Sequence, residues 1–292
     1  MAAGPDNTPL IAIVGETASG KSDLALKIAE KFSGELIAAD SWTVYKDFNI
    51  GTAKPSPEER KRVPHHLIDI ADPNTGFSAA EYKRIAVSAA GEISSKGKLP
   101  VMVGGTGLYI DSVIFDYSFL PPASPEIREE LNQLTIDELL QKLDDLEIDT
   151  SGIDVRNKRR LIRLVETNGV RPSKGELRPN TLVLGLEIPR DELRMRVENR
   201  VDAMFAADLE NEVKKLSIKY GWEVEPMKGI GYREFQEYFG GDQSLEQTRE
   251  RIISATLNLA KRQRTWFKRN PYIQKISGFS DAEKLISSFL NT

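Results

Sequence analysis

The chain has 292 residues, 40% of them hydrophobic and 29% charged, which is ordinary for a globular protein. It has no cysteine, and its only histidines are His65 and His66. Disulfides, thiolate zinc sites and histidine-rich metal cages are therefore excluded, and any metal must have oxygen ligands. The formal net charge of −4 argues against a protein coated in positive potential.

A phosphate loop follows the first apolar run, 10–14. Residues 15–22 match the pattern G-x-x-x-x-G-K-[ST], and a helical pattern follows over 23–32. Such a loop surrounds a diphosphate with backbone N–H groups, while its lysine supplies charge and the next hydroxyl suits Mg²⁺. A turn that binds nothing is the alternative, but the strand and helix on either side argue against it. We predict a diphosphate site at Gly15, Thr17, Ala18, Ser19, Gly20, Lys21 and Ser22, with Ser22 as the metal ligand.

Short apolar runs then alternate with helical patterns. Buried parallel strands are predicted at 10–14, 35–39, 66–70, 100–103 and 181–188. Capping boxes at Ser78 with Glu81 and at Thr135 with Glu138 predict helix starts. This order predicts an α/β fold with a doubly wound parallel sheet, like that of the P-loop NTPases.

A proline-rich segment at 120–125 interrupts the alternation, and the pattern is then helical to about residue 180. We therefore predict an inserted all-helical subdomain over 121–180, within a core formed by 1–120 and 181–292. The C-terminal region is predicted to be helical, with one long amphipathic helix from Leu193 to Leu216 and another capped by Ser244 and Gln247.

Chemically useful residues follow two further strands. Asp40 follows the strand at 35–39, and Gly104–Gly107 follow the strand at 100–103. Because the carboxyl ends of parallel strands meet at one edge, both lie near the phosphate loop. Asp40 and the segment Gly104–Gly107 could each simply form a turn after the strand. Together they offer an anion cradle, a carboxylate that accepts a proton, and backbone N–H groups beside the Thr106 hydroxyl.

Two basic clusters stand out, and either one could be a polyanion contact or solvated surface. In a helix, Arg156, Arg160 and Arg163 share one face and have no acidic partner at matching spacing. The full clusters are Arg156, Lys158, Arg159, Arg160 and Arg163, and then Lys261, Arg262, Arg264, Lys268 and Arg269 around Trp266 and Phe267.

Several motifs together resemble the tRNA dimethylallyltransferases, the IPP transferase family. Beyond the phosphate loop, they span essentially the whole chain: 39–41 with 44–45, Ile50–Pro55 (IGTAKP), Pro64–Asp69 (PHHLID), 104–106 with 108–109, Ile230–Arg233 (IGYR) and Ala260–Gln263 (AKRQ). The sequence departs from the family at Glu16, where proline is usual, and at Thr43, where glutamine is usual.

The resemblance implies transfer of a dimethylallyl group from dimethylallyl diphosphate to N6 of the adenosine 3′-adjacent to the anticodon. Lys21 and Ser22 with Mg²⁺ would stabilise the departing diphosphate, and Asp40 would accept the amine proton. Thr106 would lie beside the reacting centre. Arg196 and Arg200, one turn apart on the same predicted helix, would both lie near the diphosphate.

The resemblance also implies contacts to the tRNA anticodon stem-loop, whose target base must be flipped out. Asp40, Ser41, Trp42 and Thr43 would contact the target nucleotide. The stem would contact Arg156, Arg159, Arg160 and Arg163, and we also assign Lys261 and Arg262 to the RNA surface. Residues 1–9 lack a targeting pattern and no run could span a bilayer, so we expect a cytoplasmic monomer with no membrane partner.

Three other functions stay open. An enzyme that prenylates free adenosine nucleotides shares these motifs, but the basic patch at 156–163 argues against it. A phosphate-loop kinase of small molecules would use ATP. A non-enzymatic nucleotide switch fits poorly with Asp40 and Thr106 at the crevice.

Overall fold

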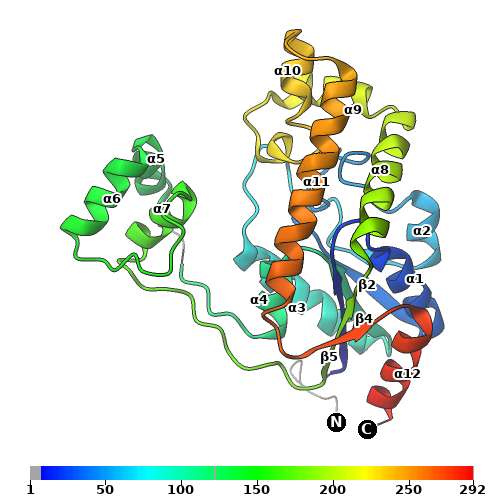
Figure 1. Ribbon diagram of the computed structural model, residues 1–292. Helices are drawn as coiled ribbons and strands as arrows, with labels where there is room; N and C mark the ends of the chain where they lie inside the picture. Colours follow the sequence, from blue (N-terminus) through cyan, green and yellow to red (C-terminus); the bar gives the residue numbers. More distant parts are fainter. Residues whose placement is uncertain (1–7, 122, 292) are drawn as a thin grey trace. The chain divides into compact units, whose positions relative to one another are not determined.

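The computed structural model describes residues 8–121 and 123–291 (Figure 1). Contacts divide the chain into two compact units. One combines the chain up to Ile114 with the chain from Leu177 onward, and the other is Phe115–Glu176. These boundaries lie a few residues before the predicted limits of 121 and 180. A role of this unit in tRNA binding stays a prediction.

The larger unit is built on a six-stranded sheet whose strand pairs are all parallel, in the order β3-β2-β4-β1-β5-β6. The strands at 10–14, 35–39, 100–103 and 181–188 are confirmed within a few residues. Their bounds are β1 Leu10–Gly15, β2 Gly34–Ala39, β3 His65–His66, β4 Leu99–Gly104, β5 Thr181–Leu186 and β6 Ile273–Ile276.

Two strand predictions need correction. The strand expected at 66–70 is wrong beyond its first residue, because Leu67 (φ 64°) and Asp69 (φ 58°) have left-handed backbones that cannot continue a strand. The edge strand β6 was not predicted, because it is short and two of its four residues are exposed.

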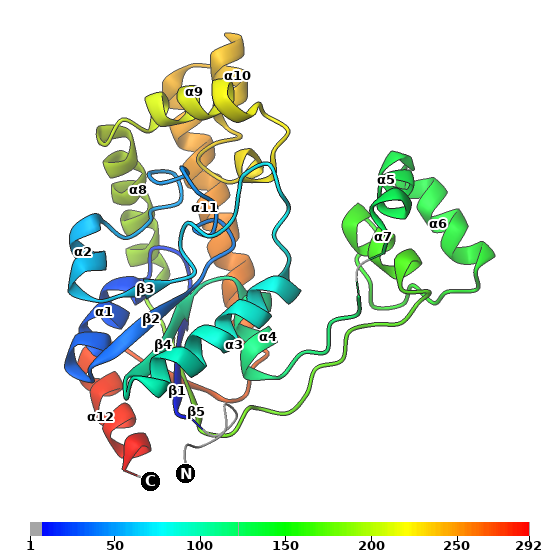
Figure 2. The same cartoon turned by 180° about the vertical axis from the view of Figure 1, so that it is seen from behind.

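Helices cover both faces of the sheet (Figures 1 and 2). On one face α1 (Lys21–Lys31) packs with α12 (Phe279–Leu290), where Ile28 and Ile286 join Ile11 and Ile13 in one apolar core. On the other face α3 (Ala79–Ser95) packs with α4 (Gly107–Ile114). The small helix α2 spans Pro57–Arg62. The predicted capping box at Ser78 and Glu81 is confirmed.

The C-terminal region is helical, but the single long helix predicted from Leu193 to Leu216 is wrong. The chain forms α8 (Arg190–Ala206) and α9 (Leu209–Tyr220), which are separated where Asp208 adopts a left-handed backbone, φ 71°. The 3-10 turn η1 (Glu225–Lys228) and α10 (Phe235–Gly240) follow. The long helix α11 (Leu245–Phe267) begins at the predicted Ser244–Gln247 capping box.

The smaller unit contains α5 (Pro125–Gln133), α6 (Ile136–Asp145) and α7 (Lys158–Glu166). Their apolar faces share a core that includes Leu131, Leu139 and Leu161. The capping box of Thr135 with Glu138 begins α6 as predicted.

Candidate active site

The phosphate loop joins β1 to α1 with left-handed backbone at Ala18 (φ 60°) and Gly20 (φ 90°). A Cβ at Gly20 would also lie 3.0 Å from the Arg196 guanidinium, so both the turn and the close approach favour glycine. Lys21 begins α1, and its ammonium donates a 3.0 Å hydrogen bond to the Glu16 carbonyl across the loop. A bound diphosphate would replace that carbonyl as the partner of the lysine.

Arg196, predicted as a diphosphate ligand, holds the loop from α8. Its guanidinium donates to the Ser19 carbonyl at 2.8 Å and pairs with Glu192, one turn earlier on the same helix, at 2.6 Å. These contacts fix the loop backbone. Direct contact between Arg196 and a diphosphate stays a prediction.

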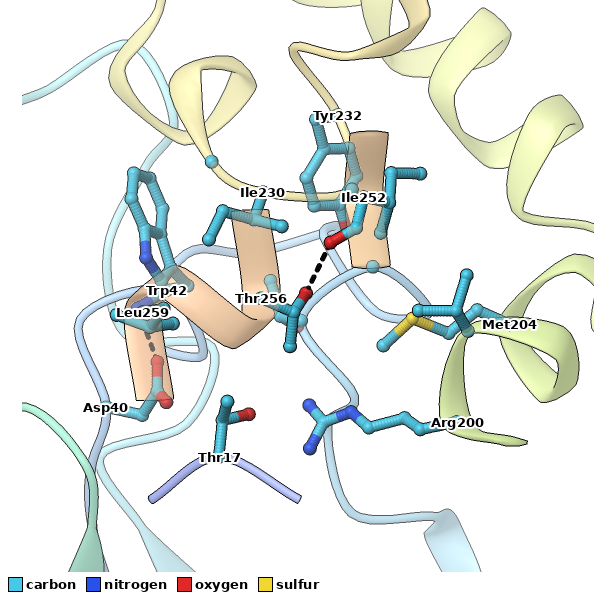
Figure 3. A pocket seen from close by; sticks show the side chains of 15 residues that line it. Thr17, Asp40, Trp42, Arg200, Met204, Ile230, Tyr232, Ile252, Thr256 and Leu259 are labelled. Atoms are coloured by element: carbon cyan, nitrogen blue, oxygen red, sulfur yellow. Dashed lines mark hydrogen bonds between the residues drawn. The ribbon is translucent and has the colours of Figure 1, made fainter. Parts of the chain in front are cut away.

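Two charged residues from separate elements line one pocket beside the loop. Figure 3 shows Thr17 of the loop between Asp40, which follows β2, and the Arg200 guanidinium, which comes from α8. Burial and the nearby Arg200 lower the pKa of Lys21 to about 8, while Asp40 and Glu16 oppose this shift. Burial likewise lowers the pKa of Arg200, and Asp40 opposes that shift. With Glu16 paired to Arg264, the two carboxylates face three cations, and the group keeps one excess positive charge that a diphosphate can neutralise.

Asp40 serves the turn after β2 and also faces the pocket. Its Oδ1 accepts a 2.9 Å hydrogen bond from the Trp42 backbone N–H, and its backbone carbonyl accepts one from the Thr43 hydroxyl at 3.3 Å. The bond from Trp42 orients the carboxylate beside the pocket, which Asp40 also lines. Asp40 therefore belongs to the turn after β2, and its role as a base stays a prediction.

Thr106 connects the ends of β4 and β2. Its hydroxyl oxygen accepts from the Ser41 N–H at 3.0 Å and donates to the Ser41 hydroxyl at 3.3 Å. The expected cluster of available N–H groups is wrong at Thr106, whose own N–H donates to the Ala39 carbonyl. The neighbouring glycines are required by packing, since a Cβ at Gly105 would lie 2.3 Å from the Gln263 side chain.

Gln263 on α11 joins the two loops of the site. Its Oε1 accepts from the Thr17 N–H at 2.8 Å, and its Nε2 donates to the Gly105 carbonyl at 3.0 Å. The residue is buried. Sequence reasoning noted the AKRQ motif but assigned no role to the glutamine. This bridge sets the spacing between the phosphate loop and the loop that carries Thr106.

The IGTAKP and PHHLID motifs meet in an ion cluster. The Lys54 ammonium, almost fully buried, contacts Asp69 at 2.6 Å, and Arg60 contacts the other Asp69 oxygen at 2.8 Å. Hydrogen bonds from Lys54 and Arg60 outweigh burial and lower the pKa of Asp69. Nearby, the Glu212 carboxylate of α9 accepts from the backbone N–H groups at 49–51. These motifs hold the loop that supplies Gly51 to the pocket.

The departure at Glu16 is accommodated by an ion pair. The carboxylate contacts the Arg264 guanidinium of α11 at 2.7 Å, and the residue is only 6% exposed. The acidic side chain therefore has its own cation. At the second departure, Thr43 is buried, so its side chain serves the turn after β2.

The first basic cluster requires correction. Arg156 lies before α7, not on it, and pairs with Asp154 at 3.3 Å. The Arg163 guanidinium pairs with Glu166 at 3.1 Å and donates to the Leu120 carbonyl at 2.6 Å, so the expected lack of partners is wrong. Asp154 and the Leu120 carbonyl lie outside helical spacing, but Glu166 is three residues after Arg163 on α7, so this acidic partner was overlooked in the sequence. Of the predicted group, Arg159 and Arg160 lie exposed on α7.

The second basic cluster combines exposed cations with aromatic rings that pack inside the fold. Lys261 and Arg262 are exposed on α11, as an RNA contact requires. Trp266 instead donates its indole N–H to Asp111 at 3.0 Å, and Phe267 is buried. These two aromatic rings belong to the packing of α11.

Among the described residues, no group of three or more histidine, cysteine or acidic side chains could hold a metal. Ser22 is exposed on the first turn of α1, beside Lys21. One hydroxyl suits Mg²⁺, which is usually held by few protein ligands together with phosphate oxygens and waters.

The model of the IPP transferase family matches residues 43–270. This chain belongs to that family. It is 41% identical over 272 residues to the tRNA dimethylallyltransferase of Pediococcus pentosaceus, covering 89% of this chain and 87% of that protein. It is 38% identical over 275 residues to that of Bacillus subtilis, covering 89% and 88%.

Solved structures confirm the fold. The tRNA isopentenylpyrophosphate transferase of Bacillus halodurans matches with a TM-score of 0.75 at 34% identity, over 98% of this chain and 96% of that one. A eukaryotic dimethylallyltransferase described as acting on tRNA matches with a TM-score of 0.76 at 27% identity, over 94% and 75%. The predicted α/β phosphate-loop fold is therefore confirmed. Within 8–121 and 123–291, no helix combines the length and apolarity needed to cross a membrane.

Proposed function

We propose that this enzyme is a tRNA dimethylallyltransferase, which transfers a dimethylallyl group to N6 of the adenosine 3′-adjacent to the anticodon and releases diphosphate. Asp40 and Arg200 line one partly apolar pocket beside the phosphate loop, and both act electrostatically on Lys21 of that loop; this grouping carries the proposal. It matches the activity in the names of relatives that align over most of both chains.

Different residues act on the leaving diphosphate and on the attacking amine. The bond between N6 and C1 of the allyl group forms as the C1–O bond breaks, and the electron pair leaves with the diphosphate. Lys21 and Arg200 stabilise this growing negative charge, and Asp40 accepts the proton that N6 loses. Thr106 holds the turn beside Asp40 through Ser41.

Ser22 and the diphosphate oxygens would together hold Mg²⁺. The bound ion would supply further charge neutralisation at the leaving group. The phosphate loop backbone, held by Arg196 and Gln263, positions the diphosphate whether or not the ion is present.

The tRNA contacts divide between the two units. Asp40, Ser41, Trp42 and Thr43 form the turn that would meet the flipped base, and Trp42 packs against Gly229. Arg159, Arg160, Lys261 and Arg262 are exposed and would contact phosphates. Action as a cytoplasmic monomer remains a prediction.

One assay tests the function. The purified protein is incubated with labelled dimethylallyl diphosphate and either tRNA, AMP or no acceptor, and products are digested and analysed by mass spectrometry. We expect isopentenyladenosine only in tRNA. Modification of AMP alone would identify a free-nucleotide enzyme, and phosphate transfer from ATP without prenylation would identify a kinase.

A further inference from the structure

The pocket beside Asp40 continues away from the phosphate loop into an apolar end. Figure 3 shows Met204, one turn beyond Arg200 on α8, pointing toward Ile252 and Thr256 of α11. Met204 and Ile252 are both buried. Val201 of α8 also lines this end.

Polar groups at this end are turned to other partners. The Thr256 hydroxyl donates to the Ile252 carbonyl within α11 at 2.7 Å, and the Tyr232 hydroxyl donates to Glu212 at 2.8 Å. The end of the pocket therefore suits a hydrocarbon group rather than a hydroxylated one.

The reaction geometry directs the hydrocarbon there. In an in-line displacement, the attacking N6, C1 and the leaving oxygen share one line, so the rest of the prenyl chain must leave C1 sideways. Asp40 marks the amine end of that line, and Thr17 with Arg200 marks the diphosphate end. The apolar space between α8 and α11 is the part of the pocket that remains for the chain.

We propose that Met204 and Ile252 form the end wall of the prenyl pocket and limit the transferred group to five carbons. This inference rests on the proposed function and adds the determinant of its substrate length. The whole cavity, from Thr17 and Asp40 to Met204 and Ile252, has a volume of about 60 Å³. At about 10–15 Å³ for one water-sized group, even the whole cavity holds only roughly four to six such groups, so it has no room for the ten carbons of a geranyl chain.

Truncating the wall should admit the longer chain. Met204→Ala and Ile252→Ala each remove three heavy atoms, so the double variant removes more atoms than the five carbons that geranyl adds. Met227→Ala and Ile253→Ala are matched controls, since both residues are also buried but do not line this pocket. The assay measures kcat/KM for tRNA prenylation with dimethylallyl diphosphate and with geranyl diphosphate.

We expect wild type to prefer dimethylallyl diphosphate by about 10²-fold or more, as misfit chains are rejected at roughly 10–200-fold per excess methylene. The double variant should raise the geranyl-to-dimethylallyl ratio by about 10²-fold, and Met204→Ala alone by about 10-fold. The controls should leave the ratio unchanged. If the double variant does not fold, the geranyl-to-dimethylallyl ratio of Met204→Ala alone tests the inference.

An unchanged ratio in a folded variant would overturn the inference. A wild type that already uses geranyl diphosphate well would do the same, as would a control variant with an equal gain. A wild type that fails to prenylate tRNA from dimethylallyl diphosphate would instead overturn the proposed function. The two failures are therefore distinguishable.

Discussion

The bridge through Gln263 gives the sharpest prediction about how this site is assembled. Gln263→Leu keeps the side chain near its original size but removes both the 2.8 Å bond from the Thr17 N–H and the 3.0 Å bond to the Gly105 carbonyl. The phosphate loop and the loop after β4 then lose their direct connection. Because a misplacement of about 1 Å can cost roughly 10²-fold in rate, we expect kcat/KM to fall by about that factor.

The same variant should also be less stable. Each of the two groups left without its hydrogen-bond partner costs about 1–3 kcal/mol, so the free energy of unfolding should fall by about 2–6 kcal/mol. At roughly 2–4 °C per kcal/mol for a large domain, Tm should fall by about 4–24 °C. Thermal denaturation and steady-state kinetics on the same samples measure both effects.

Gln243→Leu is the matched control. The Gln243 side chain donates to the Glu234 carbonyl at 2.6 Å and to the Thr248 hydroxyl at 2.7 Å, and it does not line the pocket. Because Gln243 is half-buried, this variant should lose some stability and keep its kcat/KM. Normal kcat/KM in Gln263→Leu, or an equal loss in Gln243→Leu, would refute the reasoning.

Four further predictions concern charge. Lys21→Ala should lower turnover strongly with little change in Tm, because its ammonium donates to a carbonyl of its own loop. Burial lowers the Lys21 pKa to about 8, so the ammonium is charged below that pH and neutral above it. An NMR titration should therefore show one lysine with a pKa near 8, and its signal should be missing from the spectrum of Lys21→Ala. Asp40→Asn should lower kcat by about 10²-fold or more with tRNA affinity kept, and normal turnover with lost affinity would contradict a base. Neutralising Arg159 and Arg160 should reduce the slope of log tRNA affinity against log salt concentration by roughly one unit per lost contact. Arg163→Gln should mainly lower stability, because this side chain donates to the Leu120 carbonyl. An unchanged slope after neutralising Arg159 and Arg160 would exclude their contact with RNA.

The components at the strand ends could be predicted from sequence because their placement follows from topology. Gly15 ends β1, Asp40 follows β2 and Gly104 ends β4, and adjacent parallel strands bring these ends to one edge. The walls of the pocket could not be predicted in the same way. Met204 and Ile252 reach it only because α8 and α11 pack against each other, and hydrophobic spacing along each helix does not show what the helix faces.

The sequence predictions were wrong where a local backbone conformation or a distant contact overrode the periodic pattern. The apolar period from Leu193 to Leu216 predicted one helix, yet the left-handed backbone at Asp208 divides it. The arginine period at 156–163 predicted one exposed face. Arg163 is instead held by the Leu120 carbonyl, which is remote in sequence and invisible to helical spacing.

Helix α11 links the two halves of the chemistry. Its Arg264 neutralises Glu16 inside the phosphate loop, and the preceding residue, Gln263, joins that loop to the end of β4. Two and three turns earlier on the same helix, Thr256 and Ile252 line the prenyl end of the pocket. Because a helix moves as a rigid rod over this length, any shift of α11 displaces the diphosphate cradle and the hydrocarbon wall together. The acidic residue at position 16 is therefore compatible with anion binding, since the Arg264 guanidinium balances its charge beside the cradle and ties the phosphate loop to α11.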